Sequence, residues 1–120
     1  MILGIGIDLI ELNRIERAVI KNKRFIERIL TVNEQQAYNK FTKFSRQIEY
    51  LAGRFAVKEA FGKATGRGLG KLSFQDIEVL KSNNGAPTIT AKGYDKEHIF
   101  VSISHSKEYV VAQIVINDDK

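Results

Sequence analysis

The chain begins with the alternating pattern of a β-strand, but this segment includes two glycines and an aspartate, which the interior of a strand disfavours. Over residues 2–10, leucine and isoleucine at the odd positions 3–9 alternate with Gly4, Gly6 and Asp8, so the apolar side chains share one face. Glycines leave room for a close approach to the backbone, whereas a carboxylate in an apolar strand is costly unless a cation meets it. The segment therefore predicts a buried strand with a charged group that needs a partner.

Apolar residues at helical spacing follow this strand. Over residues 11–30 their pattern predicts a helix that is interrupted near Asn22. Thr31 and Glu34 then have the spacing of a capping box, in which each side chain bonds the backbone N–H of the other residue. This pair predicts a second, short helix that ends near Lys40.

A longer helix is predicted over residues 46–65, with its end at Gly66 and Gly68. After it, short runs rich in β-branched residues predict strands, and an Asn-Asn-Gly turn at 83–85 separates the first two. The runs cover residues 77–81, 88–91, 99–104 and 109–116. The order of one strand, then helices, then an antiparallel β-meander predicts an α+β fold.

Length and composition limit the fold and the setting. With 120 residues, 43% of them hydrophobic, the chain is expected to form one domain over residues 1–120. It has no cysteine, which excludes disulfides and thiolate chemistry and favours the cytoplasm. The apolar segment at the start is too short to span a bilayer and lacks a basic lead-in. A soluble, unprocessed protein without a membrane partner is expected.

The predicted long helix carries a carboxylate on its apolar face. At about 100° per residue, Glu59 lies about 40° from Phe55 and within the apolar stripe, so it should face inward. Arg54 and Lys58 lie to one side of the stripe and Lys63 to the other, which suits the binding of phosphate oxygens around a metal-bound carboxylate. An ordinary ion pair between Glu59 and Lys63 on a solvated face explains the spacing equally well.

Asp8 has two interpretations. It can cap the following helix, with Glu11 in the third helical position closing an acidic capping box. It can also pair with Glu59, since two carboxylates among basic groups are what Mg²⁺ uses when substrate phosphates complete its ligand shell. Zinc is disfavoured, because the chain has no thiol and 2 histidines. Together the two carboxylates point to a shared metal ion.

His105 ends a predicted strand among serines, where it is either a hydrogen-bonded structural residue or a catalytic one. Ser104 and His105 are strand neighbours that face opposite sides, and the chain has no G-x-S-x-G segment. Leu9 occupies the third glycine position of a dinucleotide motif that would start at Gly4, and no G-K-[ST] segment of a P-loop is present. Serine-hydrolase, dinucleotide and P-loop chemistry are therefore excluded.

A basic ridge follows the first helical region, in a chain whose net charge of +5 favours anionic partners. The ridge consists of Arg14, Arg17, Lys21, Arg24 and Arg28. It is a solvated face, a docking surface for an acidic protein, or a contact for a phosphate backbone. Only Phe25 adds an aromatic ring, so a stacking platform for nucleic acid is not evident. A two-metal phosphohydrolase would need further carboxylates, of which Glu11 is the close candidate.

Several segments together resemble one family of small enzymes. They are Gly4-Ile5-Gly6-Ile7-Asp8 with Arg14, Leu30-Thr31-x-x-Glu34, Arg54-Phe55-Ala56-x-Lys58-Glu59-Ala60 with Lys63, and Ser102-Ile103-Ser104-His105. In this order they resemble the holo-acyl-carrier-protein synthases, the small bacterial 4′-phosphopantetheinyl transferases, over nearly the whole chain. The resemblance implies the α+β fold of that family and a homotrimer with active sites at the subunit interfaces.

The resemblance also implies an activity. Members of the family transfer 4′-phosphopantetheine from coenzyme A to a serine of apo acyl carrier protein, in support of fatty acid biosynthesis, and release adenosine 3′,5′-bisphosphate. By this likeness Asp8 and Glu59 bind Mg²⁺, which neutralises the pyrophosphate and its leaving phosphate. Coenzyme A is then the co-substrate and the acidic carrier protein is the partner, with no nucleic acid involved.

Roles for individual residues follow from their positions in the family's motifs. The implied catalytic residues are Asp8, Glu59, Lys63 and His105. The implied coenzyme A contacts are Lys63 at the pyrophosphate, Arg46, Arg54 and His105 at the nucleotide phosphates, and Asn84, Gly85 and Pro87 on the adenine side. The implied carrier-protein docking residues are Arg14, Arg17, Lys21, Arg24 and Phe25. Ser45 departs from relatives that have a second basic residue before Arg46.

Overall fold

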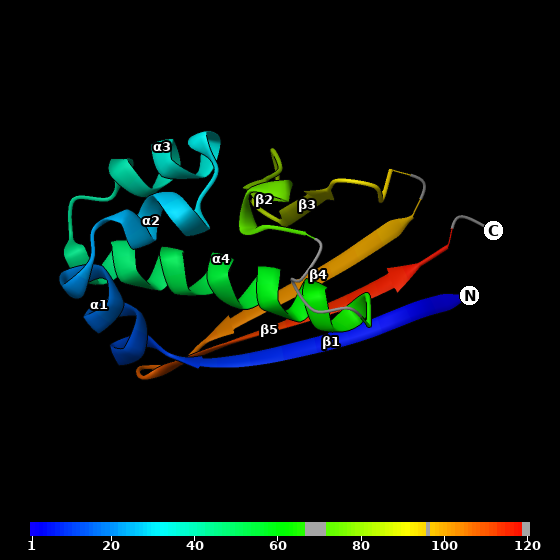
Figure 1. Cartoon of the computed structure of the whole chain (residues 1–120), viewed down its shortest axis with the longest axis horizontal. Helices are drawn as coiled ribbons and strands as arrows, with labels where there is room; N and C mark the ends of the chain where they lie inside the picture. The colour runs from blue at the N-terminus through cyan, green and yellow to red at the C-terminus, as the bar shows by residue number, and fades with distance from the viewer. Residues whose placement is uncertain (67–71, 96, 119–120) are drawn as a thin grey trace.

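The computed structural model describes residues 1–66, 72–95 and 97–118 and places two antiparallel sheets around one long helix (Figure 1). In chain order the elements are β1 (Ile2–Glu11), α1 (Leu12–Lys21), α2 (Arg24–Ile29), α3 (Val32–Lys40), α4 (Phe44–Ala64), the 3-10 helix η1 (Phe74–Asp76), β2 (Ile77–Lys81), β3 (Pro87–Ala91), β4 (His98–His105) and β5 (Tyr109–Asn117). Strands β1, β5 and β4 form a three-stranded sheet in this order, and β2 and β3 form a separate hairpin. The predicted α+β fold is confirmed.

The predicted elements all occur, with one difference in how the strands are grouped. The C-terminal strands are antiparallel, but they divide between two sheets instead of forming one meander, because β5 pairs with β1 as well as with β4. The first helical region breaks at Asn22, as predicted. Gly66 follows α4 with φ +76°, a left-handed conformation that favours glycine. Gly68, the other predicted stop, lies outside the described residues.

The capping box predicted at the start of α3 is present. The Thr31 side-chain oxygen accepts the backbone N–H of Glu34 at 3.3 Å, and Glu34 Oε1 accepts the backbone N–H of Thr31 at 2.8 Å. These bonds satisfy two backbone donors that a helix start otherwise leaves without partners, so they fix where α3 begins.

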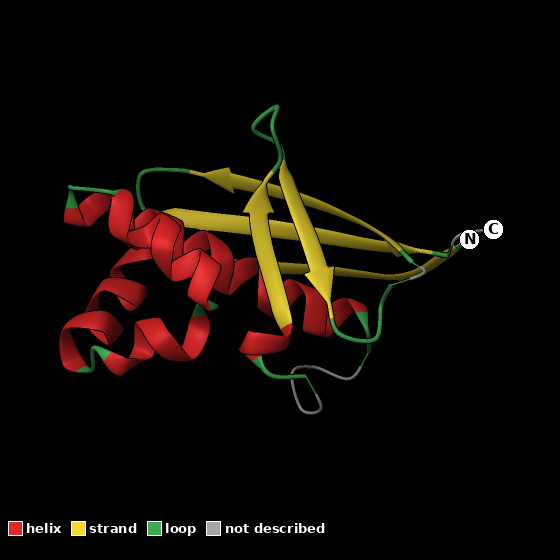
Figure 2. Ribbon diagram, turned by 90° about the horizontal axis from the view of Figure 1, so that it is seen from above, coloured by secondary structure: helices red, strands yellow, loops and turns green. Residues whose placement is uncertain are grey.

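The middle of helix α4 is enclosed by other elements. The three-stranded sheet lies against one side, and α2 and α3 cover the other, with the β2–β3 hairpin beside them (Figure 1). Figure 2 shows the hairpin strands running across the direction of the longer strands. Residues 50–58 are all buried, as expected for a helix enclosed by other elements. None of the helices in the described ranges combines the length and apolar character that a membrane crossing needs.

Strand β1 packs on α4 through its glycine face, the face on which the sequence predicted room for a close approach, so the predicted buried strand is buried on that face alone. A Cβ on Gly4 would meet the carbonyl oxygen of Ala64, and a Cβ on Gly6 would meet that of Ala60. Because these side chains are missing, the helix backbone lies directly on the strand. The alternation in the sequence identified the two faces correctly but not which of them meets the core.

The apolar face of β1 points away from α4 and is largely uncovered. Its side chains at positions 3, 5, 7 and 9 are 53–63% exposed, and Phe100 on β4 is 58% exposed. The strand register places Val115 of β5 between Ile5 and Phe100, so the apolar surface continues across the sheet. We call this surface, made of Leu3, Ile5, Ile7, Leu9, Phe100 and Val115, the outer sheet face. An exposed apolar surface of this kind marks contact with another molecule.

We expect Gly6→Ala to destabilise the fold, because the added Cβ would overlap the Ala60 carbonyl oxygen and force β1 away from α4. Overpacking of this kind costs about 1–3 kcal/mol of unfolding free energy, which chemical denaturation measures. As a control, Gly53→Ala adds a methyl group to α4 at an ordinary 3.6 Å from His105 Nε2 and should change the stability little. Equal stability of Gly6→Ala and the wild type would contradict the close approach of helix and strand.

Candidate active site

Asp8 and Glu59 belong to a charged cluster where β1 meets α4. Asp8 is on the glycine face of β1, and Lys63 Nζ of α4 lies 3.1 Å from Asp8 Oδ1 and 2.9 Å from the carbonyl oxygen of Ile7. Glu59 lies one helical turn before Lys63, close enough to Asp8 for the two charges to interact. The structure therefore brings together the carboxylates that the sequence paired, and we call Asp8, Glu59 and Lys63 the carboxylate cluster.

This geometry argues against the capping role of Asp8 and against a simple surface pair for Glu59. The N-cap residue of α1 is Glu11, whose side chain makes no capping bond, so Asp8 does not cap that helix. Lys63 forms its ion pair with Asp8 across the two elements. It is not the partner of Glu59 in a simple pair along the helix surface.

The electrostatics of the cluster favour a bound cation. Burial raises the pKa of Glu59, and the charge of Asp8 raises it further, while Lys63 and Arg14 lower it. Asp8 Oδ2 is buried and accepts no hydrogen bond from the described residues. A buried carboxylate oxygen without a partner is costly. A divalent cation between the carboxylates would offset the repulsion between Asp8 and Glu59 and would give Asp8 Oδ2 a partner.

The oxygen donors of this cluster fit Mg²⁺. Asp8 and Glu59 would hold the ion through carboxylate oxygens, and Mg²⁺ usually keeps waters and substrate phosphates as its remaining ligands. Within the described ranges, no group of 3 or more metal-ligating side chains gathers, and Glu11 is exposed at the end of β1. The described residues therefore lack the additional carboxylates that a two-metal phosphohydrolase would need.

A second cluster surrounds a cavity of about 310 Å³ on the β4 side of the sheet. Its lining residues are Arg54, Lys81, Gly85, Pro87, Val101, Ser102, Ile103 and His105. Predicted site residues from α4, from the turn after β2 and from the end of β4 thus come together. Among the described residues, basic side chains line this cavity and no carboxylate does, so it is suited to an anionic ligand. We call it the basic cavity.

Arg54 and His105 are held in place by their surroundings. Arg54 is 7% exposed, its guanidinium carbon lies 4.1 Å from the centre of the Tyr50 ring, and its Nε has no hydrogen-bond partner among the described residues. The His105 ring lies beside Gly53, and its Nε2 is 3.4 Å from the carbonyl oxygen of Glu49. A buried guanidinium with an unused donor is well placed to bind phosphate.

Lys81 is a lining residue that sequence reasoning missed. It ends β2, and it lines both the basic cavity and an adjoining cavity of about 210 Å³, to which Lys40, Tyr50 and Arg54 also contribute. The available signal was a lysine directly before the turn whose residues the family resemblance assigns to the adenine side.

Two of the predicted contacts, Arg46 and Asn84, do not line the basic cavity. Arg46 is exposed, with Nε 3.9 Å from a carboxylate oxygen of Glu49 and its guanidinium 5.9 Å from the centre of the Phe41 ring. Asn84 shapes the turn after β2, because its Oδ1 accepts the backbone N–H of Ala86 at 3.2 Å. Asn84 is the sequence neighbour of the lining residue Gly85, and Arg46 precedes Arg54 on the same helix. Both serve local structure in a single chain.

Lys58 does not lie with the phosphate-binding groups, which corrects the expectation from helix spacing. Its side chain is fully buried, and its Nζ lies 2.6 Å from Glu34 Oε1 of α3. Helix spacing gives the direction of a side chain but not what packs against that face. Here α2 and α3 cover it, so the ammonium meets a carboxylate instead of solvent.

The carboxylate cluster and the basic cavity lie at opposite edges of the three-stranded sheet. Asp8 is on β1 and His105 is on β4, with β5 between them. Since neighbouring strands lie about 4.8 Å apart, the two edges are about 10 Å apart. The cluster and the cavity present two separate groups of polar side chains in the described part of the chain, and we call these groups the two half-sites.

The residues of the basic ridge are all exposed on α1 and α2. Phe25, the aromatic residue predicted to dock with them, is partly buried, and its ring centre lies 6.1 Å from that of Phe55. The ridge is thus accessible to an acidic partner, whereas part of the Phe25 ring serves the core.

Comparison with known proteins identifies the family. Residues 4–114 match the family of 4′-phosphopantetheinyl transferases. The chain belongs to the 4′-phosphopantetheinyl transferase superfamily. This transferase is 55% identical over 116 residues to the holo-[acyl-carrier-protein] synthase of Oceanobacillus iheyensis, with 97% of each chain covered. It is 52% identical over 117 residues to the synthase of Listeria innocua, with 97% of this chain and 98% of the relative covered.

A solved structure agrees with the fold of the transferase. The holo-(acyl-carrier-protein) synthase of Bacillus anthracis, in complex with CoA (3′,5′-ADP), has a TM-score of 0.90 to this chain at 50% identity, with 98% of each chain covered. The family and the fold that the sequence motifs predicted are confirmed.

The raised pKa of Glu59 predicts how stability depends on pH and on metal. A carboxyl group whose pKa is raised above its ordinary 4.5 holds its proton more tightly in the folded state, so stability is lost as the pH rises through this range. At pH 7 without metal, Glu59→Gln should therefore melt above the wild type, and this difference should vanish below about pH 4. The melting temperature in chelator measures it.

Added Mg²⁺ should reverse this order of melting temperatures, so that the wild type melts above Glu59→Gln. A ligand that binds only the folded state raises its stability, so the wild type should gain melting temperature with Mg²⁺ while Glu59→Gln should gain little. An equal response of both proteins to Mg²⁺ would contradict a metal site at the carboxylate cluster.

Proposed function

We propose that this transferase moves 4′-phosphopantetheine from coenzyme A to a serine of apo acyl carrier protein, in the cytoplasm and in support of fatty acid biosynthesis. The serine oxygen bonds to the phosphorus next to pantetheine, the serine proton is released, and the broken P–O bond frees adenosine 3′,5′-bisphosphate. The carboxylate cluster carries the proposal, because two carboxylates and a lysine meet where β1 crosses α4. The relatives named above, one of them in complex with coenzyme A, support it.

Each half-site suits one part of coenzyme A. Mg²⁺ held by Asp8 and Glu59 would neutralise charge on the pyrophosphate during transfer. Lys63 is already next to this position and would bind a pyrophosphate oxygen. Arg54 and His105 would bind the nucleotide phosphates in the basic cavity, and the exposed Arg46 would contact them from the start of α4.

The adenine side of the nucleotide belongs to the turn after β2 in this proposal. Gly85 and Pro87 line the basic cavity, and Asn84 would present its backbone and side chain from the same turn. Gly85 has φ +84°, which lets the turn form without steric cost. Lys81, at the end of β2, would add a further positive charge near the phosphates.

We further propose that the protein works as a homotrimer with active sites between subunits. Two observations support this assembly. The outer sheet face is apolar and exposed in a single chain, and the two half-sites lie at opposite edges of the sheet. Subunits that cover the outer sheet face by packing sheet against sheet would join the carboxylate cluster of one chain to the basic cavity of the next.

The basic ridge suits the carrier protein. Arg14, Arg17, Lys21 and Arg24 present charge to solvent from two consecutive helices, which attracts an acidic surface and raises the rate of encounter. Phe25 would contribute its exposed edge. Nucleic acid is a weaker match, because a partly buried Phe25 offers no stacking platform.

The direct test of this function is the mass of the carrier protein. After incubation of the wild type with apo acyl carrier protein, coenzyme A and Mg²⁺, mass spectrometry should detect the addition of one phosphopantetheine. Asp8→Ala and Glu59→Ala should each abolish this product while circular dichroism shows a folded protein, since each removes a charged ligand from a site with few others. An unmodified carrier with all three components present would refute the proposal, as would full activity of both variants in chelator.

Mixed subunits test whether the active site is shared. Asp8→Ala and His105→Ala are each expected to be inactive alone, but they damage different half-sites. If the sites form between chains, equal mixing after subunit exchange should restore up to about one quarter of wild-type activity, because that share of interfaces receives both intact halves. A mixture of Asp8→Ala with Glu59→Ala, which damages the same half-site, should stay inactive. Absence of complementation in trimers that demonstrably exchange subunits would contradict an interfacial site.

A further inference from the structure

A buried ion pair links α3 to α4 and has no part in the mechanism described above. The side chains of Glu34 and Lys58 are both 0% exposed, and Lys58 Nζ lies 2.6 Å from Glu34 Oε1. The same ammonium donates to the carbonyl oxygen of Ile29 at 2.7 Å and to that of Phe74 at 3.1 Å. Lys58 thus uses its three donors on three different elements, namely the end of α2, the start of α3 and η1.

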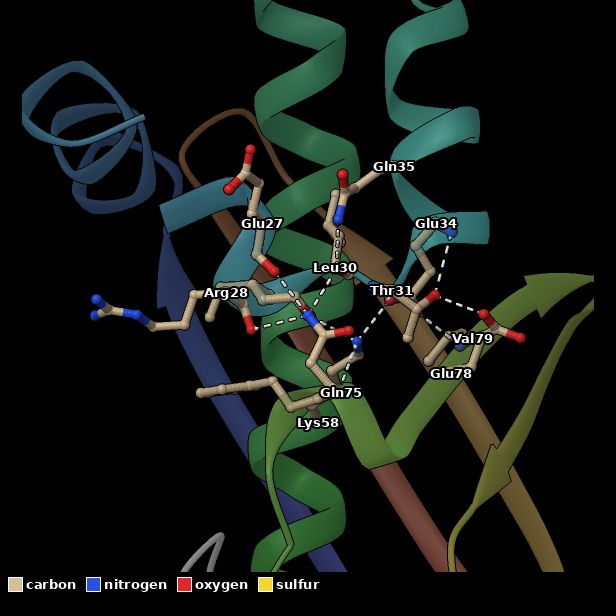
Figure 3. A network of polar contacts seen from close by, with 12 residues as sticks. Glu27, Arg28, Leu30, Thr31, Glu34, Gln35, Lys58, Gln75, Glu78 and Val79 are labelled. Atoms are coloured by element: carbon tan, nitrogen blue, oxygen red, sulfur yellow. Dashed lines mark hydrogen bonds and ion pairs between the residues drawn. The ribbon is translucent and has the colours of Figure 1, made fainter. Parts of the chain in front are cut away.

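Glu34 extends this network to the β2–β3 hairpin (Figure 3). Its Oε2 accepts the backbone N–H of Val79 at 2.7 Å, in the middle of β2, while Oε1 accepts that of Thr31. The Thr31 hydroxyl in turn donates to Glu78 Oε2 at 2.5 Å. The two buried charges therefore hold the chain at Phe74, just before β2, and at Val79 within it.

The hairpin depends on such contacts for its position. It forms a sheet of its own, without backbone hydrogen bonds to the three-stranded sheet in the described part of the chain. Its place against α4 is set by the burial of Ile77 and Val79, which are both 0% exposed, and by the bonds to Glu34 and Lys58. Apolar packing alone is not directional, whereas a carboxylate that accepts a specific N–H fixes where β2 lies along its neighbours.

The hairpin also forms one wall of the basic cavity. Gly85 and Pro87 line that cavity together with Arg54 and His105. Arg54 lies one helical turn before Lys58 on α4, so the two project from the same side of the helix. A shift of the hairpin relative to Lys58 would therefore change the width of the cavity at Arg54.

We propose that Glu34 and Lys58 are positioning residues, which set the distance between the β2–β3 hairpin and Arg54 and thereby the fit of the nucleotide end of coenzyme A. This inference rests on the proposed function for the identity of the ligand. A buried ion pair is a weak source of stability, because desolvation of both charges offsets their attraction, but it imposes a specific geometry. The positioning role accounts for a buried pair whose bonds reach α2, α3, η1 and β2.

The test removes both charges together, so that neither is left buried without a partner. In Glu34→Gln/Lys58→Met the Val79 N–H should exchange with deuterium faster, because it loses its charged acceptor. The dissociation constant for coenzyme A, measured by calorimetry, should rise by at least about tenfold, as expected when a binding wall is misplaced. The KM for apo acyl carrier protein should stay within about twofold, since the basic ridge is unchanged.

Gln75→Leu is the matched control. It removes hydrogen bonds at 2.6 and 2.9 Å from the Gln75 side chain to the carbonyl oxygens of Glu27 and Leu30, but it leaves the Glu34–Val79 contact in place. It should lower the melting temperature and leave coenzyme A binding unchanged. Equal weakening of coenzyme A binding in Gln75→Leu would assign the effect to lost stability and overturn the positioning role.

If the double variant does not fold, Thr31→Val decides the question. It keeps the shape of the side chain but loses the bond to Glu78 on β2 and the bond from the Glu34 N–H at the start of α3. Both losses loosen the link between α3 and the hairpin, so this variant should weaken coenzyme A binding less strongly and in the same direction. Unchanged binding in a folded variant with faster Val79 exchange overturns the inference. Failure of the wild type to bind coenzyme A would instead refute the proposed function, and Val79 exchange would then report on the hairpin alone.

Discussion

The direct contact between the backbone of α4 and the glycine face of β1 is the constraint on which the rest of the structure depends. Side chains at Gly4 and Gly6 would collide with the carbonyl oxygens of Ala64 and Ala60. Their absence lowers the helix onto the strand, and this short distance brings Lys63 within 3.1 Å of Asp8. The same glycines that permit the packing therefore assemble the carboxylate cluster.

The closeness of this contact also explains why both half-sites can be built on one helix. With β1 so near, α4 is enclosed by the sheet on one side and by α2, α3 and the hairpin on the other. Its successive faces then serve different purposes, since Glu59 and Lys63 face β1 whereas Arg54 faces the basic cavity. A rigid, buried helix holds such groups in fixed relation better than a loop does.

Much of this arrangement could be predicted from the sequence, because local patterns carry local information. The capping box at Thr31 and the break at Asn22 follow from spacing along the chain. The pairing of Asp8 with Glu59 follows from the cation that carboxylates at apolar positions need. Features that depend on what lies opposite a given face did not follow. Lys58 was expected beside phosphate but meets Glu34 from a different helix. The strand at β1 was expected to be buried, yet its apolar side is exposed, because an alternating strand does not reveal whether its covering partner is the same chain or another.

The exposed outer sheet face has a consequence for how the protein behaves at low concentration. In the proposed trimer, burial of Leu3, Ile5 and Phe100 contributes stabilising free energy only when chains associate. Folding stability and chain concentration are therefore linked by mass action. Dilution would then uncover apolar β-structure and separate the two half-sites in the same step. Under this assembly, loss of activity and the onset of aggregation share one cause, and newly made chains pass through the vulnerable state before they find their partners.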